Sequence, residues 1–403
     1  SKGNYYDDFS MWDIYRAQLP LFELLKPELI NDAVQSMILK GSQGGWLPIF
    51  PCWNSYTAAM IGDHGTAFIA SAYTKGIRNY DVNEAYRLMR QNAFDIPSRP
   101  DYINGKGRRA LDTYLKYGYI PMEDSVPDAF HKKEQVSRTL EYAYDDYALA
   151  MVAKGLNKTA DYTALMNRSQ NYRNVFDAKV NMVRGRYIDK SWYEPFKGNA
   201  KEPYITEGTP QQYTFYVPHD VQGLARLMGG RAKLEQSLDT LFNGGEYWHG
   251  NEPGHQIPFL YNYTGSPWKT QLRVKEILAN EYSDGPGGLS GNDDAGQMSA
   301  WYVFAALGFY PVDPVSNNYL LTTALFDRIT ISLPNEKKLT IVTHKQSKNS
   351  GYISAVRWDK KAYTKSYLSH ERLKNGGLIE VTLTDKPNKK WATGLTDQPL
   401  VKK

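Results

Sequence analysis

Two adjacent carboxylates are the side chains of this protein whose types and spacing most clearly suggest chemistry. Asp293 and Asp294 lie in the run Gly291-Asn-Asp-Asp-Ala-Gly-Gln-Met-Ser-Ala-Trp301, where a glycine-bounded loop leads into an apolar segment. The pattern predicts that they occupy the N-cap and first turn of a helix, where free N–H groups and the helix dipole stabilise negative charge. Taken alone, such a pair is more often an ordinary helix cap than a ligand site.

Two further carboxylates favour a ligand site over simple capping. Glu207 lies in Ile205-Thr-Glu-Gly208, and Glu252 lies in His249-Gly-Asn-Glu-Pro-Gly-His255. Both runs are polar loops that contain glycine and lie between apolar segments. Loops that carry polar clusters between regular elements commonly hold the functional residues of a protein.

The elements that must position these loops are mainly helices. Apolar spacing up to about residue 310 predicts about eleven of them, at 10–25, 27–40, 63–75, 82–94, 134–154, 159–174, 217–228, 231–243, 254–264, 267–281 and 294–307. Helical hairpins with long loops on one rim indicate an (α/α)6 barrel, which needs twelve helices. We therefore expect a catalytic domain at 1–310 that lacks its first helix, and we expect an N-terminal part of the protein to precede Ser1.

After residue 310 the pattern changes to short runs rich in β-branched residues. Four runs alternate between apolar and polar residues and are separated by turn signals, at 328–333, 338–343, 352–356 and 377–383. We therefore predict a small antiparallel β module at 311–403.

Composition excludes several classes of protein. The 403 residues include 48 Lys and Arg and 43 Asp and Glu, which are interspersed and give a formal net charge of +5. A nucleic-acid partner is therefore not expected. There is also no apolar run long enough to cross a bilayer, and no signal peptide.

Cys52 is the single cysteine, so no disulfide can form within the chain, and we interpret it as structural.

Nine short runs, in order over about residues 5–400, carry a resemblance to a known family. They are Trp12-Asp-Ile-Tyr-Arg16, Gly62-Asp-His64, Thr139-Leu-Glu-Tyr-Ala-Tyr-Asp-Asp146, Thr206-Glu-Gly208, Val217-Pro-His-Asp220, His249-Gly-Asn-Glu-Pro253, Tyr261-Asn-Tyr263, Pro267-Trp-Lys-Thr-Gln271 and the run around Asp293. Together they resemble glycoside hydrolase family ninety-two. The resemblance implies a calcium-dependent exo-α-mannosidase that inverts the anomeric configuration. It also implies an N-terminal β-sandwich, which this chain would lack.

The resemblance assigns roles to several residues. Glu207 matches the general acid and Asp294 the general base, while the role of Asp293 is less certain because Asn292 stands where many members carry an assisting Asp. Trp12, Asp13 and Arg16 match residues that line the pocket for the terminal mannose. An inverting hydrolase needs its two carboxyl groups about 6.5–9.5 Å apart, so that a water molecule fits between them.

The loop around Glu252 is expected to hold the calcium ion and the leaving sugar. Calcium prefers carboxylate and amide oxygens, so Glu252, Asn251 and Asp294 are the candidate ligands, and Glu252 is also the alternative general acid. His249 and His255 are candidate donors to the sugar, with a structural role weighed equally for each.

One departure from the family pattern bears on specificity. Members that cleave α-1,2 linkages typically carry two adjacent histidines before Gly-Asn-Glu, and Trp248 stands at the first of these positions. An aromatic ring offers a stacking surface instead of a hydrogen bond. An α-1,3, α-1,4 or α-1,6 linkage is therefore at least as consistent with the sequence as α-1,2.

The resulting interpretation is an enzyme of carbohydrate metabolism that removes terminal α-linked mannose from N-glycans or mannan. We expect it to be secreted, periplasmic or on the cell surface. Two alternatives remain. One is a non-catalytic mannoside-binding protein on the same scaffold, and the other is a metal-independent hydrolase of another α-glycoside that uses an acidic pair. The presence of both Glu207 and Asp294 argues against the first, and a test of metal dependence separates the second.

Overall fold

In the computed structural model, which describes residues 3–399, the chain forms two compact units. The first unit comprises the residues up to Tyr15 together with Glu28–His219. The second comprises Arg16–Pro27 together with the chain from Asp220 onward. Residues 1–2 of the expected domain 1–310 and residues 400–403 of the expected module 311–403 lie outside the described residues.

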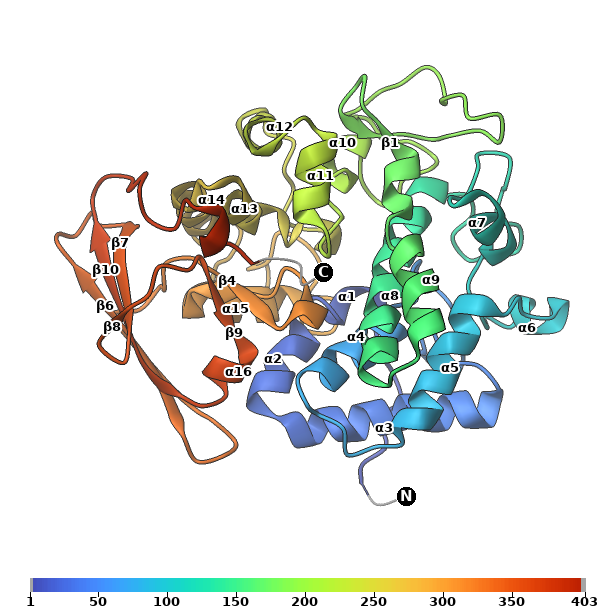
Figure 1. Ribbon diagram of the computed structural model, residues 1–403, viewed down its shortest axis with the longest axis horizontal. Coiled ribbons are helices and arrows are strands. Elements are labelled where there is room, and N and C mark those ends of the chain that lie inside the picture. The colour runs from blue at the N-terminus through green and yellow to red at the C-terminus, as the bar shows by residue number, and fades with distance from the viewer. Residues whose placement is uncertain (1–2, 400–403) are drawn as a thin grey trace. The chain divides into compact units, whose positions relative to one another are not determined.

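The first unit is built around α8 (Gln135–Gly155), a helix of 21 residues. All of its residues except Met151, Lys154 and Gly155 are buried. A helix that is covered on every side belongs in the centre of a fold. It packs against α4 (His64–Thr74), α5 (Val82–Phe94) and α9 (Thr159–Arg168), as can be followed in Figure 1.

The other elements of the first unit are shorter or lie farther from this centre. They are α1 (Met11–Ile14), α3 (Pro27–Gly44), α6 (Arg99–Ile103), α7 (Leu111–Tyr117), α10 (Pro210–Tyr213), a 3-10 helix at Asn171–Val175, and an antiparallel hairpin of β1 (Phe176–Asp177) and β2 (Met182–Val183).

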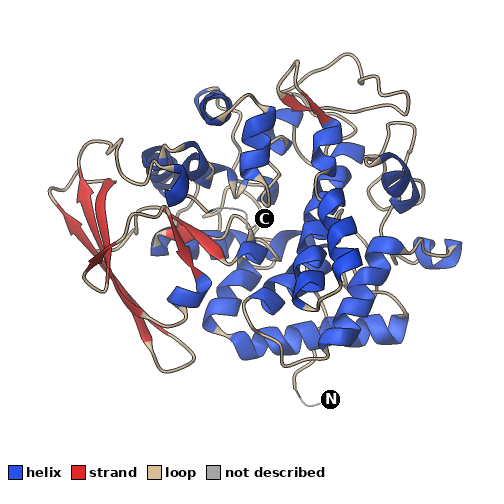
Figure 2. Ribbon diagram, in the orientation of Figure 1, coloured by secondary structure: helices blue, strands red, loops and turns tan. Residues whose placement is uncertain are grey.

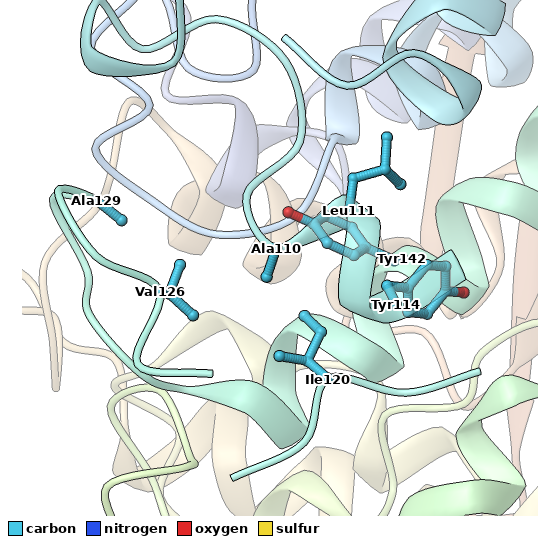
Figure 3. Packing of buried hydrophobic residues seen from close by; sticks show 7 residues of the cluster. All are labelled: Ala110, Leu111, Tyr114, Ile120, Val126, Ala129 and Tyr142. Atoms are coloured by element: carbon cyan, nitrogen blue, oxygen red, sulfur yellow. The ribbon is translucent and has the colours of Figure 1, made fainter. Parts of the chain in front are cut away.

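A buried apolar cluster fixes the segment that precedes α8 (Figure 3). Tyr142 of α8 packs here with Tyr114 of α7, and their rings meet edge to face with centroids 5.5 Å apart. The other members are Ala110, Leu111, Ile120, Val126 and Ala129. This cluster places α7 and the following loop on α8, so the long connection is an ordered part of the unit.

The second unit combines helices with two sheets, which Figure 2 shows as separate groups of strands. Its helices are α2 (Gln18–Leu25), α11 (Val221–Leu227), α12 (Arg231–Asn243), α13 (Tyr261–Thr264), α14 (Pro267–Asn280), α15 (Gln297–Leu307) and α16 (His370–Leu373), with 3-10 turns at Glu252–Gly254, Ile257–Phe259, Pro314–Ser316 and Leu395–Asp397. Helix α15 packs against α2, and α14 packs against β7. None of the helices within residues 3–399 is long and apolar enough to cross a membrane.

The larger sheet has the strand order β5-β6-β10-β7-β8, and the smaller has the order β3-β4-β9. The strands are β3 (Phe309–Tyr310), β4 (Asn318–Leu321), β5 (Arg328–Ser332), β6 (Lys338–Lys345), β7 (Tyr352–Trp358), β8 (Lys361–Ala362), β9 (Tyr367–Ser369) and β10 (Gly377–Thr384). The expectation of a purely antiparallel module is wrong, because β10 inserts between β6 and β7 and runs parallel to β6. Alternation of apolar residues is the same in parallel and antiparallel strands, so the pattern did not carry this information.

The mainly helical class and the C-terminal strands agree with the sequence prediction, but several helix boundaries differ. The predicted helix at 10–25 is broken into α1 and α2, and the one at 294–307 begins only at Gln297. The segment 254–264 contains a 3-10 turn at Ile257–Phe259 and the short helix α13, since Pro258 interrupts a continuous helix.

Candidate active site

In the second unit, two glycines bring the loop of Glu252 against the loop of Asp294. A Cβ atom built on Gly291 would lie 2.1 Å from the carbonyl oxygen of Gly250, and one built on Gly250 would lie 2.7 Å from the carbonyl oxygen of Ser290. No side chain fits into either space. The backbones therefore pack directly on one another, which places the two carboxylates on adjoining loops.

Glu252 and Asp294 form a close carboxylate pair. Glu252 is fully buried, Asp294 is half-buried, and a carboxylate oxygen of each lies within 4.8 Å of the other. Burial raises the pKa of Asp294, contact with Glu252 lowers it, and the charge of Asp293 raises it further, with a net increase. Two carboxylates in such proximity suit a divalent cation that binds oxygen, and calcium is one.

Asp293 has a different task from the one predicted. Helix α15 begins at Gln297 with Gly296 as its N-cap, so Asp293 and Asp294 are neither the N-cap nor part of the first turn. The Asp293 carboxylate nevertheless accepts hydrogen bonds from the backbone N–H of Ser299, at 2.9 Å, and from its hydroxyl, at 3.1 Å. It thus satisfies a free N–H group at the helix start from outside the helix.

Glu207 and Asp294 share a backbone feature. Both have positive φ angles of 48°, in the left-handed region that side chains with a Cβ rarely adopt. Such conformations persist where surrounding structure enforces them, and they are common at active sites. The backbone thus holds both carboxylates in place at some cost in conformational energy.

His249 and His255 lie in the interior of the second unit. The Tyr282 hydroxyl uses its proton to donate to the carbonyl of Met298. The same hydroxyl oxygen therefore accepts a hydrogen bond from Nε2 of His249, at 2.7 Å. The other ring nitrogen of His249, Nδ1, accepts from the Tyr247 hydroxyl at 2.8 Å. Burial, and then the neighbouring His255, lower the pKa of His249 well below its usual value. Both ring nitrogens of this neutral imidazole are therefore engaged within the protein.

His255 is bonded in the same way. Its Nε2 donates to the carbonyl of His249 at 3.1 Å, and its Nδ1 accepts from the amide of Gln297 at 3.1 Å. Burial, together with the charge of Arg16, lowers the pKa of His255 to about 3. The amide oxygen of Gln297 accepts from the N–H groups of Ala17 and Gln18 and so caps α2. The two histidines thus connect the Glu252 loop to the start of α15 and, through Gln297, to α2.

The remaining predicted residues of the second unit surround this core. Arg16 is buried close enough to His255 for its charge to affect the pKa of that histidine. Asn251 is half-buried, and its carbonyl accepts from the N–H of Gly254 at 3.1 Å. Trp248 is 51% exposed, so its ring is available to a ligand from solvent.

In the first unit, Glu207 is an exposed side chain on a firmly held loop. The preceding Thr206 donates its hydroxyl to Glu134 at 2.9 Å, and its backbone N–H donates to the Ser137 hydroxyl at 2.9 Å. The N–H groups of Val136 and Ser137 reach the carbonyl of Tyr204. The N-terminal end of α8 therefore anchors the Glu207 loop while leaving the carboxylate accessible.

Trp12 and Asp13 lie on α1 in the first unit and are buried. The indole N–H of Trp12 donates to Glu141 at 3.1 Å, and the Ser10 hydroxyl donates to the Asp13 carboxylate. Glu141 was not among the predicted site residues. It belongs, with His64 and Asp145, to a buried ionic cluster on α4 and α8.

The structure divides the predicted residues between the units. The first unit contains Trp12, Asp13 and Glu207, and the second contains Arg16, Trp248, His249, Asn251, Glu252, His255, Asp293 and Asp294. The expected acid and base thus come from different units of the chain. A usable signal for the missed cluster was the helix predicted at 134–154, in which Glu141 and Asp145 are spaced one turn apart and therefore lie on the same face.

Carboxylates presented on loops of a mainly helical fold define this protein as a candidate acid–base hydrolase. The chain belongs to glycosyl hydrolase family 92, because residues 1–385 match the catalytic domain of that family. The motif-based resemblance is thereby confirmed.

Solved structures of the family are similar to this chain over nearly its whole length. A family GH92 α-mannosidase from Bacteroides thetaiotaomicron is 36% identical with a TM-score of 0.89, covering 98% of this chain and 52% of that protein. A family GH92 inverting mannosidase from the same organism is 30% identical with a TM-score of 0.91, covering 98% and 56%.

A curated relative is similar over a comparable part of the chain. A secreted glycosidase of uncharacterized activity from Arthroderma benhamiae is 30% identical over 96% of this chain and 52% of its own length. The chain thus spans about half the length of the relatives it matches.

Proposed function

We propose that this chain is the catalytic part of an inverting exo-α-mannosidase that removes terminal α-linked mannose from glycans. The observation that carries the proposal is the Glu252–Asp294 carboxylate pair in a chain that belongs to glycosyl hydrolase family 92. A relative that is 36% identical is described as an α-mannosidase, and one that is 30% identical is described as an inverting mannosidase.

In this proposal Glu207 is the general acid and Asp294 the general base. Glu207 is exposed and can protonate the leaving oxygen of a bound glycan, while its loop is anchored to α8. Asp294 accepts the proton of the water that attacks the anomeric carbon from the opposite face. Asp293 assists by holding the start of α15 beside the base.

Calcium would be held by Glu252 and Asp294, with Asn251 beside them. When bound there, the ion would supply electrostatic stabilisation of the reacting mannoside. The fit rests on a fully buried carboxylate within 4.8 Å of a half-buried one, since buried carboxylates are stabilised by a cation.

The terminal mannose would bind to Trp12, Asp13 and Arg16. The leaving sugar would meet the exposed ring of Trp248, whose stacking surface favours linkages other than α-1,2. His249 and His255 are proposed to support this site rather than to open directly onto it, because their ring nitrogens are bonded within the protein.

Several broader features belong to the same proposal. The helices up to residue 310 would form an (α/α)6 barrel that lacks its first helix. Residues 311–403 would form a separate β module, and a β-sandwich would precede the chain. The relation to a secreted glycosidase supports a secreted, periplasmic or cell-surface location.

A panel of α-1,2-, α-1,3-, α-1,4- and α-1,6-linked mannobioses tests the function. We expect release of mannose from at least one of the last three, with α-1,2-mannobiose hydrolysed more slowly. Tight binding of mannosides without hydrolysis would instead indicate a mannoside-binding protein, and hydrolysis of only non-mannose α-glycosides would indicate another hydrolase.

A further inference from the structure

One buried carboxylate joins three elements of the first unit. Glu141 of α8 is fully buried. Its Oε1 accepts from the indole N–H of Trp12 at 3.1 Å and from the hydroxyl of Tyr213 at 2.8 Å. Its Oε2 lies 3.1 Å from Nε2 of His64. The carboxylate therefore contacts α1, α10 and the first residue of α4 at once.

Two of these elements carry residues of the proposed site. Trp12 directly precedes Asp13 on α1, and Tyr213 ends α10, which begins three residues after Glu207. Thr209 starts α10 with a capping box, so the short path from Glu207 to Tyr213 is fixed. A shift of the Glu141 carboxylate would thus be felt by the Trp12–Asp13 element and by the general-acid loop.

His64 holds this carboxylate in turn. Its Nδ1 lies 2.9 Å from Asp145, and the ring of Tyr15 stacks on the imidazole with centroids 4.1 Å apart and an interplanar angle of 11°. Burial lowers the pKa of His64, but the charges of Asp145 and Glu141 outweigh it and raise the pKa to about 9. At neutral pH the imidazolium therefore forms ion pairs with both carboxylates.

We propose that Glu141 is a positioning residue of the mannoside site: held by the His64 imidazolium, its carboxylate fixes Trp12 on one side and the helix after Glu207 on the other. This inference rests on the proposed function and adds to it a residue that does not touch the substrate. Partners that orient the ligating residues of metal sites affect activity about 10–100-fold, and we expect an effect of that size from a group that orients contact residues of this site.

The substitution Glu141→Gln tests the role at nearly constant shape. Trp12, Tyr213 and His64 present three donors to two carboxylate oxygens, and Gln has one oxygen and an N–H₂ group. If the amide nitrogen faces Trp12 and Tyr213, it meets at least one other donor. If it faces His64, the imidazole must give up its Nε2 proton. We expect kcat on an α-mannobiose to fall about 10–100-fold while KM changes less than about threefold, because orientation of the reacting groups is lost rather than uniform binding.

A spectroscopic measurement separates positioning from simple destabilisation. In ¹⁵N-histidine-labelled protein, Nε2 of His64 should show the shift of a protonated imidazolium nitrogen in the wild type at pH 7. In Glu141→Gln it should move toward that of a deprotonated nitrogen. The milder Tyr213→Phe, which removes one donor, should give a smaller loss of kcat and leave His64 protonated.

Asp177→Asn is the matched control, because Asp177 is a buried carboxylate of the same unit that pairs with Arg184 at 3.0 Å. It should lower the unfolding midpoint by a similar amount and leave kcat unchanged. A wild-type kcat in folded Glu141→Gln, or an equal loss in Asp177→Asn, would overturn the positioning role. A wild-type chain without mannosidase activity would instead remove the proposed function, and this inference with it.

Discussion

Raising the pH from 6.5 to 9.5 should destabilise the first unit through one residue, His64. Its pKa in the folded protein is raised to about 9, from the ordinary histidine value of 6.5 that we take for the unfolded chain. A histidine whose folded pKa is raised contributes stability that is fully present below the unfolded pKa and is lost as the pH rises through the folded pKa. Since one pKa unit corresponds to about 1.4 kcal/mol, the free energy of unfolding should decrease by about 3 kcal/mol across this window.

Urea unfolding at several pH values, followed by circular dichroism, measures this effect when the wild type is compared with His64→Gln. Groups common to both proteins cancel in the difference between their unfolding free energies. That difference should be largest at pH 6.5 and should shrink by about 3 kcal/mol by pH 9.5, because only the wild type loses a proton from His64.

A surface histidine provides the control for this experiment. His344 lies 3.5 Å from Glu380, and its side chain is 55% exposed. Exposed pairs contribute little to stability, so His344→Gln should follow the wild-type pH dependence closely. A difference in unfolding free energy between wild type and His64→Gln that stays constant from pH 6.5 to 9.5 would show that His64 is not a buried cation. Glu141 would then lack the charged partner that we assign to it.

Three further predictions concern the proposed site. Glu207→Gln should reduce the rate of mannobiose hydrolysis by about 10² to 10⁴, and should reduce the rate for an activated aryl mannoside less. The control Glu202→Gln, in the same loop, should have little effect. Equal losses on both substrates would argue against Glu207 as the acid. A chelator should abolish activity, and added calcium should restore it better than magnesium. Glu252→Gln should raise the calcium concentration that is needed for activity. Full activity after verified metal removal would exclude this metal site. Gly291→Ala should destabilise the second unit by about 1–3 kcal/mol and reduce kcat/KM, because its Cβ would lie 2.1 Å from the Gly250 carbonyl oxygen. Gly287→Ala, where nothing lies within 4 Å, is the control for that substitution, and equal behaviour of the two variants would contradict the close approach of the loops.

Local signals predicted some of the regular elements closely. Helix α5 (Val82–Phe94) lies at the predicted 82–94, where Asp81 accepts a hydrogen bond from the N–H of Glu84 and caps the helix. The four longer strands of the C-terminal sheet also coincide with the predicted runs to within about two residues. These elements are fixed by caps and alternation, which are properties of neighbouring residues.

Features that depend on distant residues were not predictable. The start of α2 is capped by the Gln297 side chain, and the start of α15 is set by the left-handed Gly296, with Asp293 reaching in from outside. The place of β10 beside β6 depends on how the connecting segments run in space. Family motifs indicated Glu207 and Asp294, but they did not reveal that Glu141 is the buried acceptor behind Trp12.

We propose Glu207 and Asp294 as the acid and base of an inverting α-mannosidase, and the anomeric form of the first product tests both roles. Proton NMR should be recorded during hydrolysis of an α-mannoside, before mutarotation mixes the anomers. If Asp294 activates water on the face opposite Glu207, β-mannose appears first. Initial formation of α-mannose would contradict the account, because it would require a carboxylate that acts as a nucleophile and forms a covalent intermediate.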